Sequence, residues 1–304
     1  MTRTMINGRR LSQLHPFCLA ILAFAGGLSC DQLTDPPLPI DAEVFVPPPV
    51  YARWWQMVES CSGLQGSLDQ IQWYATTGPL QDPQHSGEPI IAYWSRAGNR
   101  IVLVRDYMVD GGTVRHEMLH ALVRSTGHPR SAFLENCGGV VACPTQCVRD
   151  AGLPAAIDSA TPIVAPSDLE VTSAVSPASP SSAIDGGFGT FTISVHNPFQ
   201  HPVLVVLSNN PGSVATSYRY TMRRIPGGGV SSGDRALDPG LTYFAAGQTK
   251  RDVIDFLVVA IASPSVGAIQ GLGPEGIALP SGTYSFLADF GGHSAPDLSV
   301  VLNP

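Results

Sequence analysis

Length and composition limit the classes of protein to which this chain can belong. Its 304 residues are enough for two domains with hydrophobic cores, only 13% of them are charged, and the formal net charge is −7. The acidic balance and the lack of a basic patch argue against a nucleic-acid binder. We therefore expect no nucleic-acid partner.

The first 30 residues have the pattern of an export signal. Three arginines within the first ten residues precede an apolar stretch at 17–28, which is shorter than the about 20 residues that a membrane-spanning helix needs. The stretch ends in "GLSC", which resembles the lipobox of bacterial lipoproteins, with Gly27 in place of the usual leucine. The resemblance implies that Cys30 is lipidated and that the protein is anchored to a membrane of the bacterial cell envelope, on its extracytoplasmic side.

The cysteines divide according to this export signal. Cys18 is removed with the signal and Cys30 takes the lipid, which leaves an even set. An oxidising compartment favours pairing of such a set into disulfides, for which three connectivities exist. The four remaining cysteines are Cys61, Cys137, Cys143 and Cys147. We expect Cys61 to pair with Cys137, and Cys143 to pair with Cys147.

Changes in composition predict the domain organisation. After the signal peptide at 1–30, residues 31–50 contain six prolines and form a semi-extended tether. A first domain of mixed helices and strands follows at 51–150, a linker rich in Ala, Pro and Ser at 151–168, and a second domain at 169–304.

The first domain is expected to combine helices with a small sheet. In the stretch 51–64, Trp54, Met57, Val58 and Cys61 recur at helical spacing and define one face. Further along the chain, the pattern predicts a strand at 71–76, a hairpin at 89–109 that turns at 97–99, a helix that is capped by Thr113 or Asp110 and stops at Gly127, and a short helix at 130–136.

The second domain shows the pattern of an all-β fold. In "GTFTISVHN", Phe191, Ile193 and Val195 alternate with polar residues, which is typical of a strand with one buried face. Regularly spaced strands of this kind indicate an antiparallel, immunoglobulin-like β-sandwich. The strands are expected at 189–197, 202–208, 217–225, 252–262, 282–290 and 297–303.

The stretch "TVRHEMLHAL" carries the strongest chemical signal. His116 and His120 are four residues apart, so on a helix they lie one turn apart on the same face, and both imidazoles can reach one ion. Glu117 lies about 100° round the helix, within reach of a water on that ion. This pattern is typical of zinc hydrolases. The metzincin extension is absent, because Val123 and Thr126 occupy the places of its glycine and histidine.

A catalytic zinc site needs a third protein ligand, and the residues by themselves leave several candidates. His128 follows the expected helix stop at Gly127, where the chain can turn back towards the ion. Glu135 is a carboxylate on the next short helix. His85 and Asp110 are further alternatives.

The two segments "HEMLHAL" and "GHPRSAF" together resemble the site motif of SprT-like (Spartan-type) and WLM-type metallopeptidases. The resemblance covers about 22 residues and implies a zincin-like α+β fold for the first domain. It also implies that His128 is the third zinc ligand, with Phe133 packed behind it. The DNA-linked role of those families does not suit an exported protein, and we do not carry it over.

These features predict a zinc-dependent peptidase that acts on peptides or proteins. His116, His120 and His128 would hold Zn²⁺, and Glu117 would be the general base. A donor for the transition state remains open among Tyr93, Tyr107 and Arg115.

The alternative is a non-enzymatic binding lipoprotein, in which the zinc site is structural and the immunoglobulin-like domain is an interaction module. A fourth protein ligand would favour this alternative, because structural zinc sites are closed.

Overall fold

The computed structural model describes most of the chain after the predicted signal peptide. The residues described are 36–81, 89–144, 147, 150–151, 159–183, 185–206, 216–227, 230–236, 241–259 and 277–304. Residues Pro36–Pro304 form one compact unit. Cys30 and His85 lie outside the described residues. Within the described part, no helix is long and apolar enough to cross a membrane.

The first half of the unit is a small sheet with two helices. The strand order is β1-β2-β6-β5, in which β2 and β6 are parallel and β5 runs antiparallel to β6 as the outermost strand. Strands β3 and β4 form a separate pair. The elements are β1 (Glu43–Val44), α1 (Val50–Ser62), β2 (Gln72–Thr76), β3 (Leu80–Gln81), β4 (Pro89–Ile90), β5 (Ala92–Ser95), β6 (Arg100–Val104) and α2 (Gly111–Val123).

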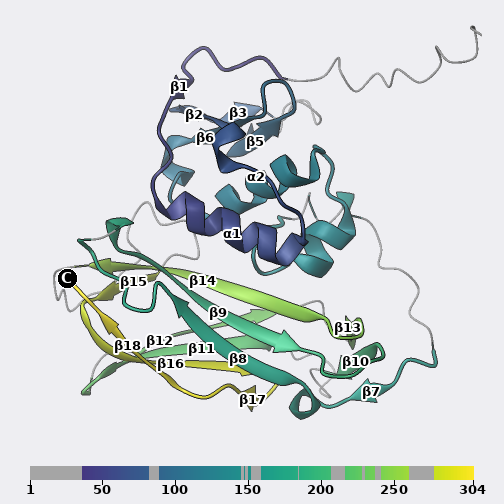
Figure 1. Ribbon diagram of the computed structural model, residues 1–304. Coiled ribbons are helices and arrows are strands. Elements are labelled where there is room, and N and C mark those ends of the chain that lie inside the picture. Colours follow the sequence, from purple (N-terminus) through teal and green to yellow (C-terminus); the bar gives the residue numbers. More distant parts are fainter. Residues whose placement is uncertain are drawn as a thin grey trace, which may run out of the picture. The chain divides into compact units, whose positions relative to one another are not determined.

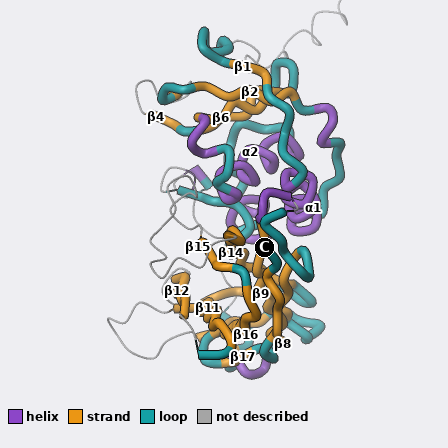
Figure 2. The backbone as a smooth tube through the Cα atoms, turned by 90° about the vertical axis from the view of Figure 1, so that its left-hand side faces the viewer, coloured by secondary structure: helices purple, strands orange, loops and turns teal. Residues whose placement is uncertain are grey.

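Both helices pack on one face of this sheet (Figure 2). Strand β6 shows how the sequence achieves this: Ile101 and Leu103 face the helices, whereas Val102 and Val104 belong to a smaller cluster on the opposite face. All four side chains are at most 9% exposed. The sheet is therefore buried on both faces at β6, as the continuous run of apolar residues requires.

Helix α1 lies where its apolar spacing predicts. Trp54 and Val58 are buried as expected, and Trp55 is buried too. Met57 and Cys61 are only partly buried, although they pack against the same core. The helix ends at Gly63, which adopts the left-handed conformation that glycine tolerates best.

Helix α2 begins at one of the two predicted caps but ends earlier than predicted. Asp110 caps its first turn, because its carboxylate accepts hydrogen bonds from the backbone N–H groups of Gly112 and Thr113. The predicted stop at Gly127 is wrong: the helix ends at Val123, and Arg124 adopts the left-handed conformation with φ of 59°. Propensity favours glycine at such a position, so the sequence signal pointed to the wrong residue.

Both expected disulfides are present. Cys61 on α1 pairs with Cys137, and Cys143 pairs with Cys147. The first bond joins residues 76 apart and closes a loop that contains strands β2 to β6 and helix α2. The second bond spans only four residues. Disulfides of this kind are typical of proteins outside the reducing cytosol.

We expect the Cys61→Ala/Cys137→Ala protein to lose about 2–5 kcal/mol of unfolding free energy, because a long loop is released in the unfolded chain. The control is Cys143→Ala/Cys147→Ala, whose short loop should have a smaller effect. Urea unfolding of both variants beside wild type measures the difference. Equal losses in the two variants would show that loop length does not govern their stability.

Short helical turns occur in both halves of the chain. They are 3₁₀ turns at Leu68–Gln70, Arg105–Tyr107, Pro166–Asp168 and Asp185–Gly187, and a π-helix at Ser131–Asn136.

The second half consists of strands in several sheets. The sheet orders are β15-β14-β9-β8, then β12-β11-β16-β17 with β18 beside β16, and β13-β10-β7. The strands are β7 (Ile163–Val164), β8 (Glu170–Ser176), β9 (Phe188–His196), β10 (Val203–Val206), β11 (Thr216–Ile225), β12 (Val230–Ala236), β13 (Leu241–Phe244), β14 (Thr249–Val259), β15 (Ile277–Pro280), β16 (Gly282–Phe290), β17 (His293–Ser294) and β18 (Leu298–Leu302).

The two larger sheets share one hydrophobic core (Figure 1). Phe191, Ile193 and Val195 of β9 are fully buried in it, as their alternation predicts. Phe286 of β16 contacts Phe191 at a ring-centroid distance of 5.1 Å, which joins the two layers. Most strand pairs of this half are antiparallel, as expected, but β15 runs parallel to β14 and β7 runs parallel to β10. Both exceptions are short strands, and alternation alone does not reveal strand direction.

Candidate metal centre

His116, Glu117 and His120 lie on the buried side of helix α2. The two imidazoles lie one turn apart, with a ring-centroid distance of 4.8 Å. Both side chains are at most 9% exposed. The left-handed turn at Arg124 then reverses the chain directly after the helix. The early helix end therefore leaves room for the following segment to return to the histidines.

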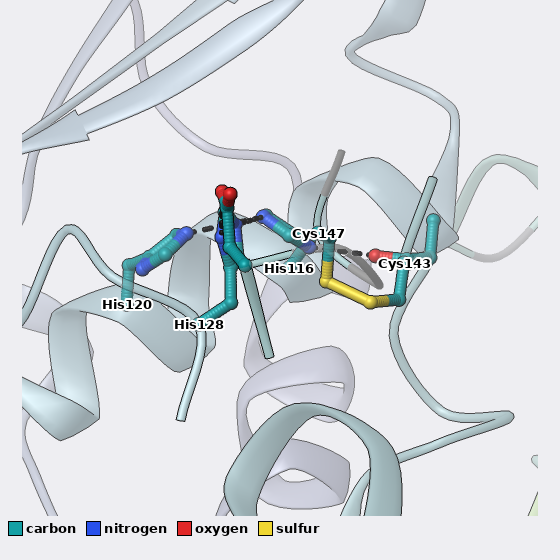
Figure 3. Close-up of a disulfide and its surroundings, with 7 residues drawn as sticks. His116, His120, His128, Cys143 and Cys147 are labelled. Carbon is teal, nitrogen blue, oxygen red and sulfur yellow. Dashed lines mark hydrogen bonds and ion pairs between the residues drawn. A yellow bond between two sulfur atoms is a disulfide. The ribbon is translucent and has the colours of Figure 1, made fainter. Parts of the chain in front are cut away.

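Three imidazoles converge at this place (Figure 3). The Nε2 atom of His116 lies 3.1 Å from Nε2 of His120 and 3.2 Å from Nε2 of His128. The ligand atoms all lie within 4.8 Å of one another, so the three histidines could hold one metal ion. His128 reaches the site from the segment after α2, and it is the third residue that the resemblance implied.

The Nδ1 atom of each imidazole lies at hydrogen-bond distance from an acceptor of the protein. His116 Nδ1 lies 2.6 Å from the carbonyl oxygen of Ala142, and His120 Nδ1 lies 2.7 Å from that of Ser125. These carbonyls can only accept, so Nδ1 donates its proton to them and Nε2 carries the lone pair. His128 Nδ1 is 3.1 Å from Oδ2 of Asp150. Partners of this kind are what metal-ligating histidines use to fix their tautomer.

The protonation and spacing of the imidazole nitrogens suit a bound cation. Burial lowers the pKa of His116 to about 3 and the pKa of His120 well below its usual range, so both imidazoles are neutral at neutral pH. Neutral Nε2 atoms this close repel one another through their lone pairs unless a cation lies between them. Tetrahedral zinc with Zn–N bonds of about 2.0–2.1 Å would separate its nitrogen ligands by about 3.3–3.4 Å, close to the contacts of His116.

Phe133 packs against all three rings. Its side chain is fully buried, and its ring centroid lies 5.0, 4.7 and 5.0 Å from those of His116, His120 and His128. It belongs to the π-helix at Ser131–Asn136, close to the predicted short helix at 130–136. An apolar wall on one side limits access of water to the imidazoles and restricts their rotation.

Glu117 is buried beside the histidines. It is 5% exposed, and burial raises the pKa of its carboxyl to about 8, whereas a hydrogen bond from the backbone N–H of Trp94 acts in the opposite direction. Its Oε2 atom has no hydrogen-bond partner among the described residues. A buried polar oxygen without a partner is costly, and a nearby cation with its water would satisfy it.

The other candidate ligands are engaged elsewhere. Glu135 is 45% exposed and forms an ion pair with Arg130 at 3.3 Å. Asp110 caps α2. Among the described residues, neither belongs to a group that could bind a metal.

The candidate transition-state donors have structural contacts. Arg115 is 2% exposed and pairs with Asp255. Tyr93 and Tyr107 belong to the small cluster on the far face of the sheet, where Tyr93 is 8% exposed.

Sequence reasoning missed the groups that hold the histidines from behind. Asp150 lies 22 residues beyond His128, and nothing in its sequence context marks it. The carbonyl groups of Ala142 and Ser125 leave no sequence signal, because every residue has one. Only a folded chain reveals these partners.

Comparison with known proteins adds no functional information. No protein-family model matches this sequence, and no curated protein matches it. One distantly similar structure is the alkylpurine DNA glycosylase AlkC of Pseudomonas fluorescens bound to DNA containing an abasic site analog, with a TM-score of 0.27, 10% identity, and coverage of 63% of this chain and 39% of that one.

Two β-glucosidases also show a distant similarity. EmGH1 of Erythrobacter marinus has a TM-score of 0.26 and 8% identity, and the matched region covers 44% of this chain and 15% of the EmGH1 chain. The enzyme of Listeria innocua in complex with glucose has a TM-score of 0.24 and 7% identity, with 45% and 16% covered. This chain thus spans well under half the length of each of the three structures, and TM-scores this low support no inference about fold or activity.

Proposed function

We propose that this protein is a zinc-dependent peptidase of the bacterial cell envelope, anchored through lipid at Cys30. The observation that carries the proposal is the convergence of three Nε2 atoms, each on an imidazole whose Nδ1 is held by an acceptor. The two disulfides agree with an extracytoplasmic location.

Zinc is the metal that this donor set favours. Three imidazoles suit zinc, and three protein ligands are the number found in catalytic rather than structural sites. In the described part of the chain, no fourth His, Cys, Asp or Glu joins the group. Cys143 and Cys147, which Figure 3 shows in the surroundings of the histidines, form a disulfide and offer no thiolate. The open site favours the enzyme over the alternative of a binding lipoprotein with structural zinc.

Glu117 is the general base in this proposal. Zinc, when bound by the three histidines, supplies Lewis-acid chemistry, which acidifies water and polarises a peptide carbonyl. In the part of the chain that the structure describes, Glu117 Oε2 has no other partner, and in the ionised form that a bound cation favours it takes the proton of the attacking water. The same carboxyl then passes this proton to the leaving amine. The hydrogen bond from Trp94 N–H orients the carboxylate for both steps.

Strand β5 lies beside the general base. It is the outermost strand beyond β6, and its Trp94 N–H donates to Glu117. A peptide hydrolysed with Glu117 as the base would therefore lie next to this strand.

Metal removal tests the proposal. We expect the purified protein to contain about one zinc ion per chain, as catalytic sites of this type do. Hydrolysis of a peptide mixture should stop after treatment with 1,10-phenanthroline and return when zinc is added. Zinc content is measured by atomic absorption and cleavage by mass spectrometry. Cleavage that persists in the metal-free protein would refute a zinc-dependent mechanism.

A further inference from the structure

Arg115, the residue directly before His116, is buried and reaches strand β14. Its side chain is 2% exposed and forms two hydrogen bonds with Asp255, Nη1 to Oδ1 at 3.1 Å and Nη2 to Oδ2 at 2.9 Å. A guanidinium group stays charged in proteins, so at this depth it needs such a partner. The helix that carries the histidines is therefore linked to the C-terminal sheets by a bidentate ion pair.

The same guanidinium also holds the segment that supports His116. Arg115 Nε donates to the carbonyl oxygen of Val140 at 2.5 Å. Two residues later, Ala142 N–H donates to the carbonyl of Gly112 at 3.0 Å, and the Ala142 carbonyl accepts the Nδ1 proton of His116. Asp255 and the acceptor of His116 are thus connected through the hydrogen bonds of Arg115 and the backbone segment 140–142.

Strand β14 has two faces with different partners. Its inward face contributes three residues to the C-terminal core: Ile254, Phe256 and Val258. On the opposite face, Val253 is 2% exposed and belongs to the core around α1 and α2. Val253 N–H also donates to the carbonyl of Gly139 at 3.0 Å. Such an outer face often meets solvent, but here alternate residues of β14 contact the metal-binding half of the protein.

Two glycines permit this close approach. A Cβ atom on Gly139, whose φ is 86°, would overlap the carbonyl oxygen of Arg251. A Cβ atom on Gly111, at the start of α2, would overlap the carboxylate of Asp255. Glycine is the residue that allows one backbone to approach another in this way.

We propose that Asp255 is a positioning residue of the metal centre. Through Arg115 it fixes segment 140–142, and with it the carbonyl of Ala142 that orients His116. The proposal rests on the proposed function, because it assumes that the three histidines bind zinc. It makes the C-terminal sheets a part of the metal site, not a spacer or an independent module.

The test is the Asp255→Asn substitution in the full chain. The new amide would turn an N–H group towards the guanidinium of Arg115, so that donor faces donor and one of the two hydrogen bonds is lost. We expect zinc affinity to fall about 10- to 100-fold, as it does when such supporting contacts are removed. Chelator competition measures the affinity. The Co²⁺-substituted protein should show a changed visible spectrum, which reports ligand geometry.

A matched control is Glu43→Gln. It makes the same change in the ion pair of Glu43 with Arg105, whose side chains are 73% and 51% exposed. Exposed pairs contribute little, so zinc affinity and the Co²⁺ spectrum should equal those of wild type.

A second variant separates positioning from stability. In Arg115→Met/Asp255→Leu both buried charges are replaced by apolar side chains, which often leaves stability unchanged or higher. The segment at Val140 nevertheless loses its donor, so we expect wild-type thermal unfolding together with weakened zinc binding.

Wild-type zinc affinity and an unchanged Co²⁺ spectrum in Asp255→Asn would overturn the positioning role and leave the proposed function intact. A wild-type protein that binds no zinc would overturn both.

Discussion

We expect the Glu117→Gln protein to bind zinc like wild type and to hydrolyse peptides about 100- to 10,000-fold more slowly, the usual contribution of a general base. Glutamine keeps the shape of the side chain and can still accept the hydrogen bond from Trp94. It cannot take a proton at the atom that corresponds to Oε2. Steady-state rates with a fluorogenic peptide, beside zinc analysis of the same samples, measure both quantities.

Glu59→Gln is the matched control for this substitution. Glu59 lies on helix α1 and accepts a hydrogen bond from the backbone N–H of Gly66 at 2.9 Å. It has no role in the proposed mechanism. Glutamine can also accept this bond, so the control should retain full activity. A Glu117→Gln protein that cleaves peptides at the wild-type rate would exclude Glu117 as the base.

We expect His128→Ala to lower zinc affinity by more than about 100-fold, because even the loss of a group that only supports a ligand costs about 10- to 100-fold. The variant removes one of three Nε2 donors and leaves His116 and His120 with their own acceptors. Hydrolysis at limiting zinc should fall accordingly. Chelator competition gives the affinity of the variant.

Two further alanine variants complete this experiment. Glu135→Ala removes the rival ligand, which is paired with Arg130, and should keep zinc. His201→Ala removes an exposed histidine of the second half and controls for nonspecific binding. Loss of zinc in Glu135→Ala, with retention in His128→Ala, would reverse the assignment of the third ligand.

Local patterns of the sequence predicted the parts of the site that depend on near neighbours. The helix that carries His116 and His120 follows from helical spacing and from Asp110 as its cap, because both act within a turn or two of the helix. His128 came from a resemblance of short motifs, and the folded chain brings it to His116.

The same reasoning placed the end of helix α2 at the wrong residue. Gly127 is the residue that propensity selects as a helix stop, yet the chain stops at Val123 and turns through Arg124. The earlier turn directs the Ser125 carbonyl to His120, a contact that no propensity expresses. The two parallel strand pairs of the second half also escaped prediction, since alternation is the same in parallel and antiparallel strands.

What the sequence by itself determined is therefore the chemistry at the site: two imidazoles and a carboxylate on one helix, and a third imidazole in the segment that follows. What only the tertiary structure decided is how these groups are held. Asp150 meets His128 across 22 residues, and Asp255 meets Arg115 across 140. Contacts over such separations depend on how whole sheets and helices pack, and pairs of polar residues far apart in a chain carry no local signature.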